Sequence, residues 1–356
     1  MMRFEELLRA AVAKGATDLH LSSGLPPFVR ISGQLTPLFP QASALDGRQS
    51  EELLAQIVPQ RAATELAENG EADFSWGLPS VGRFRINVYR QRGTLSAAVR
   101  LIPYRIPDLE QLGLPESVRG LAAKQRGIIL VTGPAGSGKS TTLASLVDLI
   151  NSQRSCHIIT IEDPIEYLHS HKRSIVDQRE VGSDTKSFSL ALRAALRQDP
   201  DVILVGEMRD LETMATAITA AETGHLVLAS LHTASAAASV ERILDIFPSS
   251  QQQQIQLQLA TTLEAIVAQQ LVPGADGLAL AVEVLLGTPA VRNLIREGKA
   301  YQLPMLMQTG GASGMQSMDS ALRKLHEQGR VTSQTAILYA TQPEEIKRLL
   351  AKGREE

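Results

Sequence analysis

Eight consecutive residues of this chain have the types and the spacing that suit the binding of phosphate groups. The run reads Gly-Pro-Ala-Gly-Ser-Gly-Lys-Ser and fits the pattern G-x-x-x-x-G-K-[ST]. Glycines let backbone N–H groups turn inward, the lysine reaches the outer phosphates, and the serine hydroxyl is a ligand for Mg²⁺. We therefore predict a nucleoside triphosphate site formed by Gly133, Pro134, Ala135, Gly136, Ser137, Gly138, Lys139, Ser140 and Thr141.

The segments that flank this run are those that a phosphate-binding loop needs. Residues 128–132 are apolar and β-branched, which predicts a buried parallel strand. Residues 141–150 are apolar at helical spacing, and the positive end of a helix dipole favours an anion. A glycine turn that binds nothing is the plainer alternative, and it fits these flanks poorly.

Acidic residues follow two of the predicted strands. Glu162 and Asp163 come at the end of one, and Glu207 follows the apolar residues 202–206. Ligands of open α/β sheets bind at the carboxyl ends of strands, where acids hold Mg²⁺ and orient water. We expect Glu162 and Asp163 to share the metal with Ser140, and Glu207 to polarise the attacking water. A helix cap or a surface turn is the alternative for each acid.

Two histidines, His225 and His232, flank the predicted strand Leu226–Leu231. Beside a nucleotide they would suit a sensor of the γ-phosphate, although a single histidine here is more often a satisfied core group. No third ligand follows at a spacing that would make a metal site.

Arginines crowd the strands predicted in the first third of the chain, and Arg83 and Arg85 share one face of a strand. With Arg100, they are candidates for arginine fingers that act on the triphosphate of a neighbouring subunit. A solvated strand face is the alternative.

Composition and length bound the class of protein. The chain has 356 residues, 44% of them hydrophobic and 21% charged, with a formal net charge of −3. These values predict a two-domain globular protein, and the slight acidity and 4% aromatic content argue against a nucleic-acid partner. The single cysteine excludes a disulfide framework. We expect no signal peptide, because acidic residues interrupt the N-terminus before any apolar run. We also expect no membrane-inserted helix, because no apolar run is long enough.

The order of predicted elements divides the chain into an α+β domain at residues 1–103, a proline-punctuated linker at 104–118, and an α/β domain at 119–356. The first domain has predicted strands at 18–21, 28–31, 74–76, 83–90 and 95–102 and a helix at 51–67. In the second, strands alternate with helices, which predicts a mostly parallel sheet with helices on both faces. Its strands are 128–132, His157–Glu162, 202–206 and Leu226–Leu231, and its helices include 186–197 and Leu211–Glu222. After residue 255 we expect mainly helix, apart from an apolar run at 279–286.

Together these motifs resemble those of the secretion ATPases of type IV pili and type II secretion, and most closely the PilT-like, pilus-retraction branch. The resemblance covers nearly the whole chain. Besides the phosphate loop and Arg83-Phe-Arg85, it rests on the runs 18–27, 158–166, 205–210, 224–233 and 290–297.

This resemblance implies a PAS-like first domain, a RecA-like P-loop NTPase second domain, and a ring of six subunits with ATP between the domains. Matched by motif, Lys139 and Ser140 bind phosphate and Mg²⁺, Glu162 and Glu207 are acidic catalytic groups, His225 and His232 line the site, and Arg83, Arg85 and Arg100 are arginine-finger candidates. The implied work is pilus retraction (twitching motility) driven by ATP hydrolysis. The implied place is the cytoplasmic side of the inner membrane, against a platform protein of the pilus.

Other functions stay open from the sequence. Assembly-type relatives commonly carry a tetracysteine zinc element and a longer N-terminal region, so a single cysteine and a domain that begins near Met1 favour retraction. A pilus-assembly or type II secretion ATPase remains an alternative. Alternatives of other classes are a RecA-like nucleic-acid motor and a scaffold gated by nucleotide. We further expect residues 290–297 to lie on a ring surface and transmit motion; the alternative is a helix packed on its own domain.

Overall fold

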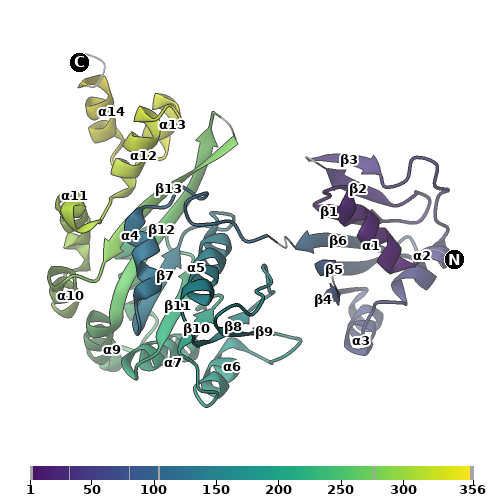
Figure 1. Cartoon of the computed structure of the whole chain (residues 1–356), viewed down its shortest axis with the longest axis horizontal. Helices are drawn as coiled ribbons and strands as arrows, with labels where there is room; N and C mark the ends of the chain where they lie inside the picture. Colours follow the sequence, from purple (N-terminus) through teal and green to yellow (C-terminus); the bar gives the residue numbers. More distant parts are fainter. Residues whose placement is uncertain (1–2, 32, 80, 103–104, 276, 353–356) are drawn as a thin grey trace. The chain divides into compact units, whose positions relative to one another are not determined.

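The computed structural model describes residues 3–31, 33–79, 81–102, 105–275 and 277–352. The chain divides into two compact units, Met1–Arg105 with Glu166–Leu168, and Ile106–Ile165 with His169–Glu356. Each unit has a β-sheet and a hydrophobic core of its own (Figure 1).

The first unit, in its described residues, combines a six-stranded antiparallel sheet in the order β3-β2-β1-β6-β5-β4 with three helices. The strands are β1 (Asp18–Leu21), β2 (Phe28–Ile31), β3 (Gln34–Pro37), β4 (Glu71–Leu78), β5 (Gly82–Gln91) and β6 (Thr94–Ile102). The helices are α1 (Phe4–Ala13), α2 (Gly47–Leu54) and α3 (Gln60–Asn69). This agrees with the predicted α+β architecture.

Period-two burial explains how this sheet packs. Phe84, Ile86 and Val88 alternate along β5 and are buried, together with Leu19 of β1 and Val99 of β6. They form one core with the apolar faces of α1, α2 and α3. The helices therefore cover one face of the sheet, and the polar residues of the same strands lie on its other face.

The predicted helix at 51–67 is wrong in one respect, because two helices replace it. Pro59 stands at the N-cap of α3, and proline disfavours helical geometry in the residue before it. Strand β3 was not predicted. Of the predicted turn at Ser32 and Gly33, Ser32 lies outside the described residues, and Gly33 has a positive φ of 83°.

The second unit contains a seven-stranded sheet in the order β13-β12-β7-β11-β10-β8-β9 within its described residues. Its strands are β7 (Gly127–Thr132), β8 (His157–Glu162), β9 (Ile175–Glu180), β10 (Val202–Val205), β11 (Leu226–Leu231), β12 (Leu263–Gly274) and β13 (Gly277–Leu286). All neighbouring pairs are parallel except β12 and β13, which are antiparallel. The prediction of a mostly parallel sheet is confirmed.

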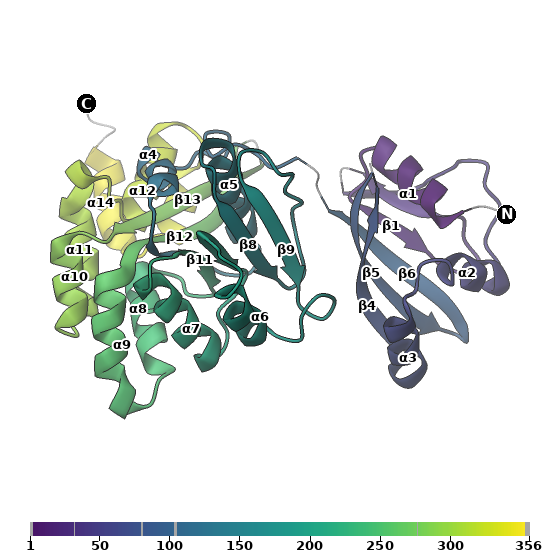
Figure 2. The same cartoon turned by 60° about the horizontal axis from the view of Figure 1, so that its bottom comes forward.

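Helices pack on both faces of this sheet, as predicted (Figure 2). Ile129 and Val131 of β7 point into a core shared with the helix Lys139–Gln153, whereas Ile128 and Leu130 point into the core on the other face, with the helices between residues 188 and 262. The helices are α4 (Glu116–Arg119), α5 (Lys139–Gln153), α6 (Phe188–Ala195), α7 (Leu211–Glu222), α8 (Ala236–Asp245), α9 (Ser249–Thr262), α10 (Pro289–Arg296), α11 (Leu303–Thr309), α12 (Met318–Glu327), α13 (Ser333–Leu338) and α14 (Pro343–Lys352), with 3-10 turns η1 (Gly120–Ala123), η2 (Ala300–Gln302) and η3 (Gly310–Ser313).

Two expectations about this unit need correction. Residues 263–274, expected to be helical, form β12, the longer arm of a hairpin with β13. The expected linker at 104–118 does not stand apart, because Leu109 and Val118 are buried in the core beside α5; Pro103 and residue 104 lie outside the described residues. Among the described helices, none has both the length and the hydrophobicity needed to cross a membrane.

Candidate functional site

The glycine loop joins the carboxyl end of β7 to the start of α5, and its backbone requires glycine. Gly133, Gly136 and Gly138 have φ values of 143°, 76° and 88°, a region that residues with a side chain rarely adopt. A Cβ on Gly133 would also lie only 2.3 Å from the main-chain oxygen of Gln269. The loop therefore has the tight turns that a phosphate cradle needs.

Lys139 is the first residue of α5, and its side chain folds back over the loop. Its Nζ donates to the carbonyl oxygens of Gly133, at 2.8 Å, and of Pro134, at 2.9 Å. The residue is only 8% exposed. The positive charge is thus held directly above the backbone that would surround a phosphate group.

The other predicted groups gather at the same edge of the sheet because their strands are parallel. β7, β11, β10 and β8 are consecutive neighbours, so their carboxyl ends form one edge. The loop follows β7, His232 follows β11, Glu207 follows β10, and Glu162 ends β8. This is the edge at which open α/β sheets bind ligands.

Glu207 is linked to the phosphate loop through a histidine. Its Oε1 lies 3.0 Å from His232 Nε2, and the other ring nitrogen of His232 lies 3.3 Å from Lys139 Nζ. The second carboxylate oxygen of Glu207 lies 2.7 Å from the guanidinium of Arg209. A continuous polar chain therefore runs from the loop lysine to the acid at the tip of β10.

The charge of Glu207 follows from these partners. Burial alone raises the pKa of this carboxyl, since its side chain is only 17% exposed. The hydrogen bond from Arg209 and the charges of His232 and Arg209 together outweigh burial, so the pKa of Glu207 lies below its ordinary value. The group is a carboxylate at neutral pH.

Glu162 and Asp163 lie two strands beyond β11, at the end of β8. The Oε1 atom of Glu162 accepts hydrogen bonds from Thr160 Oγ1 at 2.6 Å and from Gln178 Nε2 at 3.1 Å. Asp163 is exposed, and its charge acts on Arg209. These contacts fix the Glu162 carboxylate on the ligand-binding edge, separated from β7 by β11 and β10.

The structure corrects the expectation that both histidines line this site. His225 precedes β11, and its Nδ1 lies 3.0 Å from the carbonyl oxygen of Ala220. Six residues of strand span about 20 Å, so His225 lies at the opposite edge of the sheet from the phosphate loop of the same copy. Only His232 lies at the ligand-binding edge.

The three candidate arginines come together on the first unit. Arg85 and Arg100 are directly opposite each other on β5 and β6, and Arg83 lies two residues along on the same face as Arg85. The Nε atom of Arg100 lies 3.2 Å from Asp18 Oδ1. The face that these arginines share is the one opposite the apolar core.

Sequence reasoning missed several partners of the candidate residues. Arg209 stands two residues after Glu207, within the run 205–210, and its positive charge is the feature of the sequence that indicates this pair. Thr160 and Gln178 hold Glu162, but nothing in the spacing of residues 18 apart indicates that Gln178 and Thr160 meet on one carboxylate.

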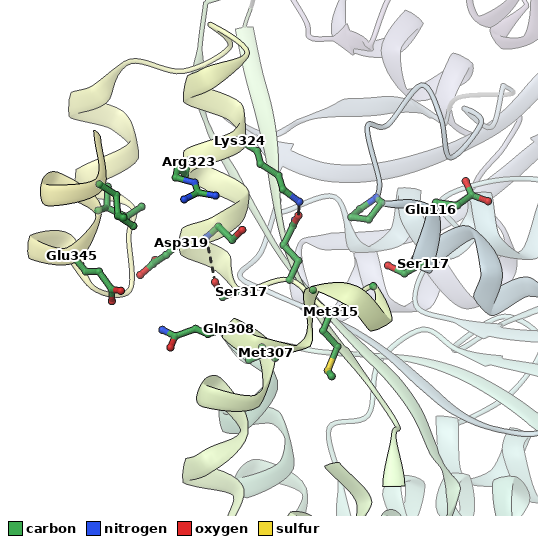
Figure 3. Close-up of a pocket in the computed structure, with 17 residues that line it drawn as sticks. Glu116, Ser117, Met307, Gln308, Met315, Ser317, Asp319, Arg323, Lys324 and Glu345 are labelled. Atoms are coloured by element: carbon green, nitrogen blue, oxygen red, sulfur yellow. Dashed lines mark hydrogen bonds between the residues drawn. The ribbon is translucent and has the colours of Figure 1, made fainter. Parts of the chain in front are cut away.

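A pocket of about 630 Å³ lies elsewhere in the second unit. Figure 3 shows Asp319, Arg323 and Lys324 of α12 on one side of it and Glu116 and Ser117 of α4 on the other. The carboxylate of Asp319 accepts backbone hydrogen bonds from Thr341 and Gln342, at 2.6 and 2.9 Å. Those bonds hold the start of α14. We therefore interpret the pocket as the space left where the C-terminal helices meet.

Comparison with known proteins agrees with this geometry. A family model described as "Type II/IV secretion system protein" matches residues 81–349. The type IV pilus retraction ATPase PilT of Pseudomonas aeruginosa is 44% identical over 344 residues, which cover 96% of this chain and 99% of that protein. The type IV pilus ATPase PilU of the same bacterium is 42% identical over 356 residues, with 99% and 93% covered.

A solved structure of the pilus retraction motor PilT with bound ADP has a TM-score of 0.90 and 49% identity, and the alignment covers 98% of this chain and all of that one. The fold and the loop thus define an ATPase of the P-loop class. The chain belongs to the type II/IV secretion system protein family, which confirms the resemblance that its motifs indicated.

Proposed function

We propose that this chain is a Mg²⁺-dependent motor ATPase that drives the retraction of type IV pili. One observation carries the enzymatic part, namely the polar chain Lys139–His232–Glu207 that connects the phosphate loop to an ionised acid. The similarity to PilT over nearly the full length of both chains supports the biological part.

ATP would bind over the glycine loop, from Gly133 to Thr141. Lys139 Nζ would exchange its bonds to Gly133 and Pro134 for bonds to the β- and γ-phosphates. Water attacks the γ-phosphorus, the bond to the bridging oxygen breaks, and ADP and phosphate are released. Glu207 orients that water, with Glu162 as the second acidic group at this edge of the sheet.

The residues present fit Mg²⁺ bound mainly through the nucleotide. No group of three or more His, Cys, Asp or Glu in the described part of the chain is placed to hold a metal ion. Mg²⁺ commonly keeps several waters and binds through phosphates and one or two protein oxygens. We assign the Ser140 hydroxyl to direct contact with the ion, and the Glu162 and Asp163 carboxylates to hydrogen bonds with the waters that the ion keeps. The ion neutralises charge on the phosphate oxygens when it is bound.

At the level of domains, we propose a PAS-like first unit and a RecA-like second unit that assemble into a ring of six. In such a ring, Arg83, Arg85 and Arg100 would act on the triphosphate of a neighbouring subunit. An arginine finger of this kind raises the rate of nucleotide hydrolysis about 10³–10⁵-fold. The ring would work in the cytoplasm, against an inner-membrane platform protein of the pilus, with no nucleic acid and no membrane insertion of its own.

ATP hydrolysis by the purified chain tests the enzymatic part. Glu207→Gln keeps the size of the side chain and removes its charge, so kcat should fall about a hundredfold or more. Glu212→Gln is the matched control, because Glu212 of α7 is half exposed and pairs with Arg193 of α6; this variant should hydrolyse ATP like the native chain. Equal turnover by both variants would remove Glu207 from the mechanism.

The same assay separates the proposed function from its main alternative of another class. Lys139→Ala should abolish turnover, and single-stranded DNA should leave the turnover of the native chain unchanged. A clear rise of turnover with single-stranded DNA would favour a nucleic-acid motor instead.

A further inference from the structure

Gln269 is a buried polar residue behind the phosphate loop that the proposed reaction does not use. It lies on β12 and is 1% exposed. Its Nε2 donates a hydrogen bond to Thr142 Oγ1 at 2.6 Å. Thr142 is also 1% exposed and lies in the first turn of α5, directly after Ser140 and Thr141.

The main chain of Gln269 touches the other end of the same loop. β12 runs parallel to β7 with Ala268 opposite Thr132, so Gln269 comes level with Gly133. A Cβ on Gly133 would lie 2.3 Å from the main-chain oxygen of Gln269. Gln269 therefore contacts the start of the loop, at Gly133, and the helix turn that follows the loop, at Thr142.

Packing alone does not account for an amide at this position. The Oε1 atom of Gln269 is buried, and within the described residues it has no hydrogen-bond partner. Burying an unpaired carbonyl oxygen costs free energy, whereas a methionine of similar length would fill the space without that cost. The feature that only the amide supplies is the bond to Thr142.

We propose that Gln269 is a positioning residue for nucleotide binding. It ties the first turn of α5 to β12 and so sets the loop, with Lys139 and Ser140, in the arrangement that receives the phosphates. A loop ordered in advance binds without spending binding energy on its own ordering. This inference rests on the proposed ATPase function and adds a residue that supports the loop from behind.

The test compares Gln269→Met with Gln270→Met in steady-state ATP hydrolysis. Gln270 is the next residue of β12, half-buried and on the opposite face of the strand. For Gln269→Met we expect KM for ATP to rise about tenfold while kcat at saturating ATP stays within about threefold, because bound nucleotide then orders the loop. Gln270→Met should keep both constants, and circular dichroism should find both variants folded.

Thr142→Val removes the other half of the same hydrogen bond. Its effect on KM should resemble that of Gln269→Met, and the double variant should be little worse than either single one. An unchanged KM in Gln269→Met would overturn the assignment, as would a loss of kcat that merely follows a loss of folded protein. If the native chain itself failed to hydrolyse ATP, the proposed function would fail first, and this assignment with it.

Discussion

Lys139 and Glu207 are the two residues on which the proposed chemistry depends, and His232 contacts both of them. In this arrangement Lys139 satisfies the carbonyl oxygens of its own loop, and Glu207 keeps its charge through Arg209 and His232. A triphosphate would compete for the lysine and leave the acid ionised beside it. His232 contacts both groups, which supports the proposal that this histidine senses the γ-phosphate.

At the scale of residues, the contact of Arg209 with Glu207 predicts a change in the pH dependence of kcat/KM. Because Arg209 lowers the pKa of Glu207, Arg209→Ala should raise that pKa, since burial then acts with less opposition. Protonated Glu207 cannot orient water, so the acidic limb of kcat/KM against pH should move to higher pH. The contribution of the carboxylate is present above its pKa and is lost as the pH falls through it.

The control for this profile is Arg193→Ala, because Arg193 pairs with Glu212 on the exposed side of α7. Its acidic limb should coincide with that of the native chain. A limb that stays in place in Arg209→Ala, or moves to lower pH, would separate Arg209 from the charge of Glu207.

Single residues differed in how well the sequence predicted them. The glycine loop was predictable because its positive φ angles demand glycine and its pattern is contiguous. The predicted position of His225 was wrong, because the whole of β11 lies between His225 and His232. The two histidines therefore lie at opposite ends of that strand. Gln269 had no signal, since its contact with Thr142 joins residues 127 positions apart.

At the scale of elements, α10 is fastened to its own unit. Val291 and Ile295 are buried, and Arg292 binds Glu264 at 2.7 Å and the carbonyl oxygen of Gly287 at 2.8 Å. The same guanidinium contacts the carbonyl oxygens at the end of α9. These three residues therefore pack on their own unit, whereas Arg296 is exposed, and the expectation that this run lies on a ring surface stays a prediction.

Arg292→Ala should consequently destabilise the second unit. The change removes a charged hydrogen-bond network with a side chain only 23% exposed, and we expect a loss of about 2 kcal/mol in the free energy of unfolding. Arg296→Ala on the same helix should change it by less than about 0.5 kcal/mol. Urea unfolding of both variants measures the difference, and equal stabilities would contradict the assigned role of Arg292.

Strand β12 was missed for a physical reason. β12 follows α9 with no glycine or proline between them, and its first residue, Leu263, simply turns to extended geometry at ψ of 120°. Its apolar run is buried on both faces, so it lacks the alternation that marks a half-exposed strand. By contrast β8, β11 and α7 have the predicted bounds, because turns or caps separate them from their neighbours.

At the scale of the whole molecule, the division into an α+β part and a mostly parallel α/β part was visible from strand and helix order. The boundary between these two parts was harder to predict from the sequence. Pro107 and Pro115 suggested a linker, yet the residues between them help to build the second core, because Leu109 is buried there. Proline marks a change of direction and does not by itself mark a domain border.

The proposed work of the molecule is the retraction of type IV pili. Its most direct test is to measure the amount of pilin on the cell surface of the organism that encodes this chain. After deletion of the gene, we predict more pilin on the cell surface and no twitching, with both effects reversed by the native chain but not by Lys139→Ala. Loss of surface filaments would instead mean that the chain drives assembly. Unchanged surface pilin and unchanged twitching would contradict a role in pilus retraction.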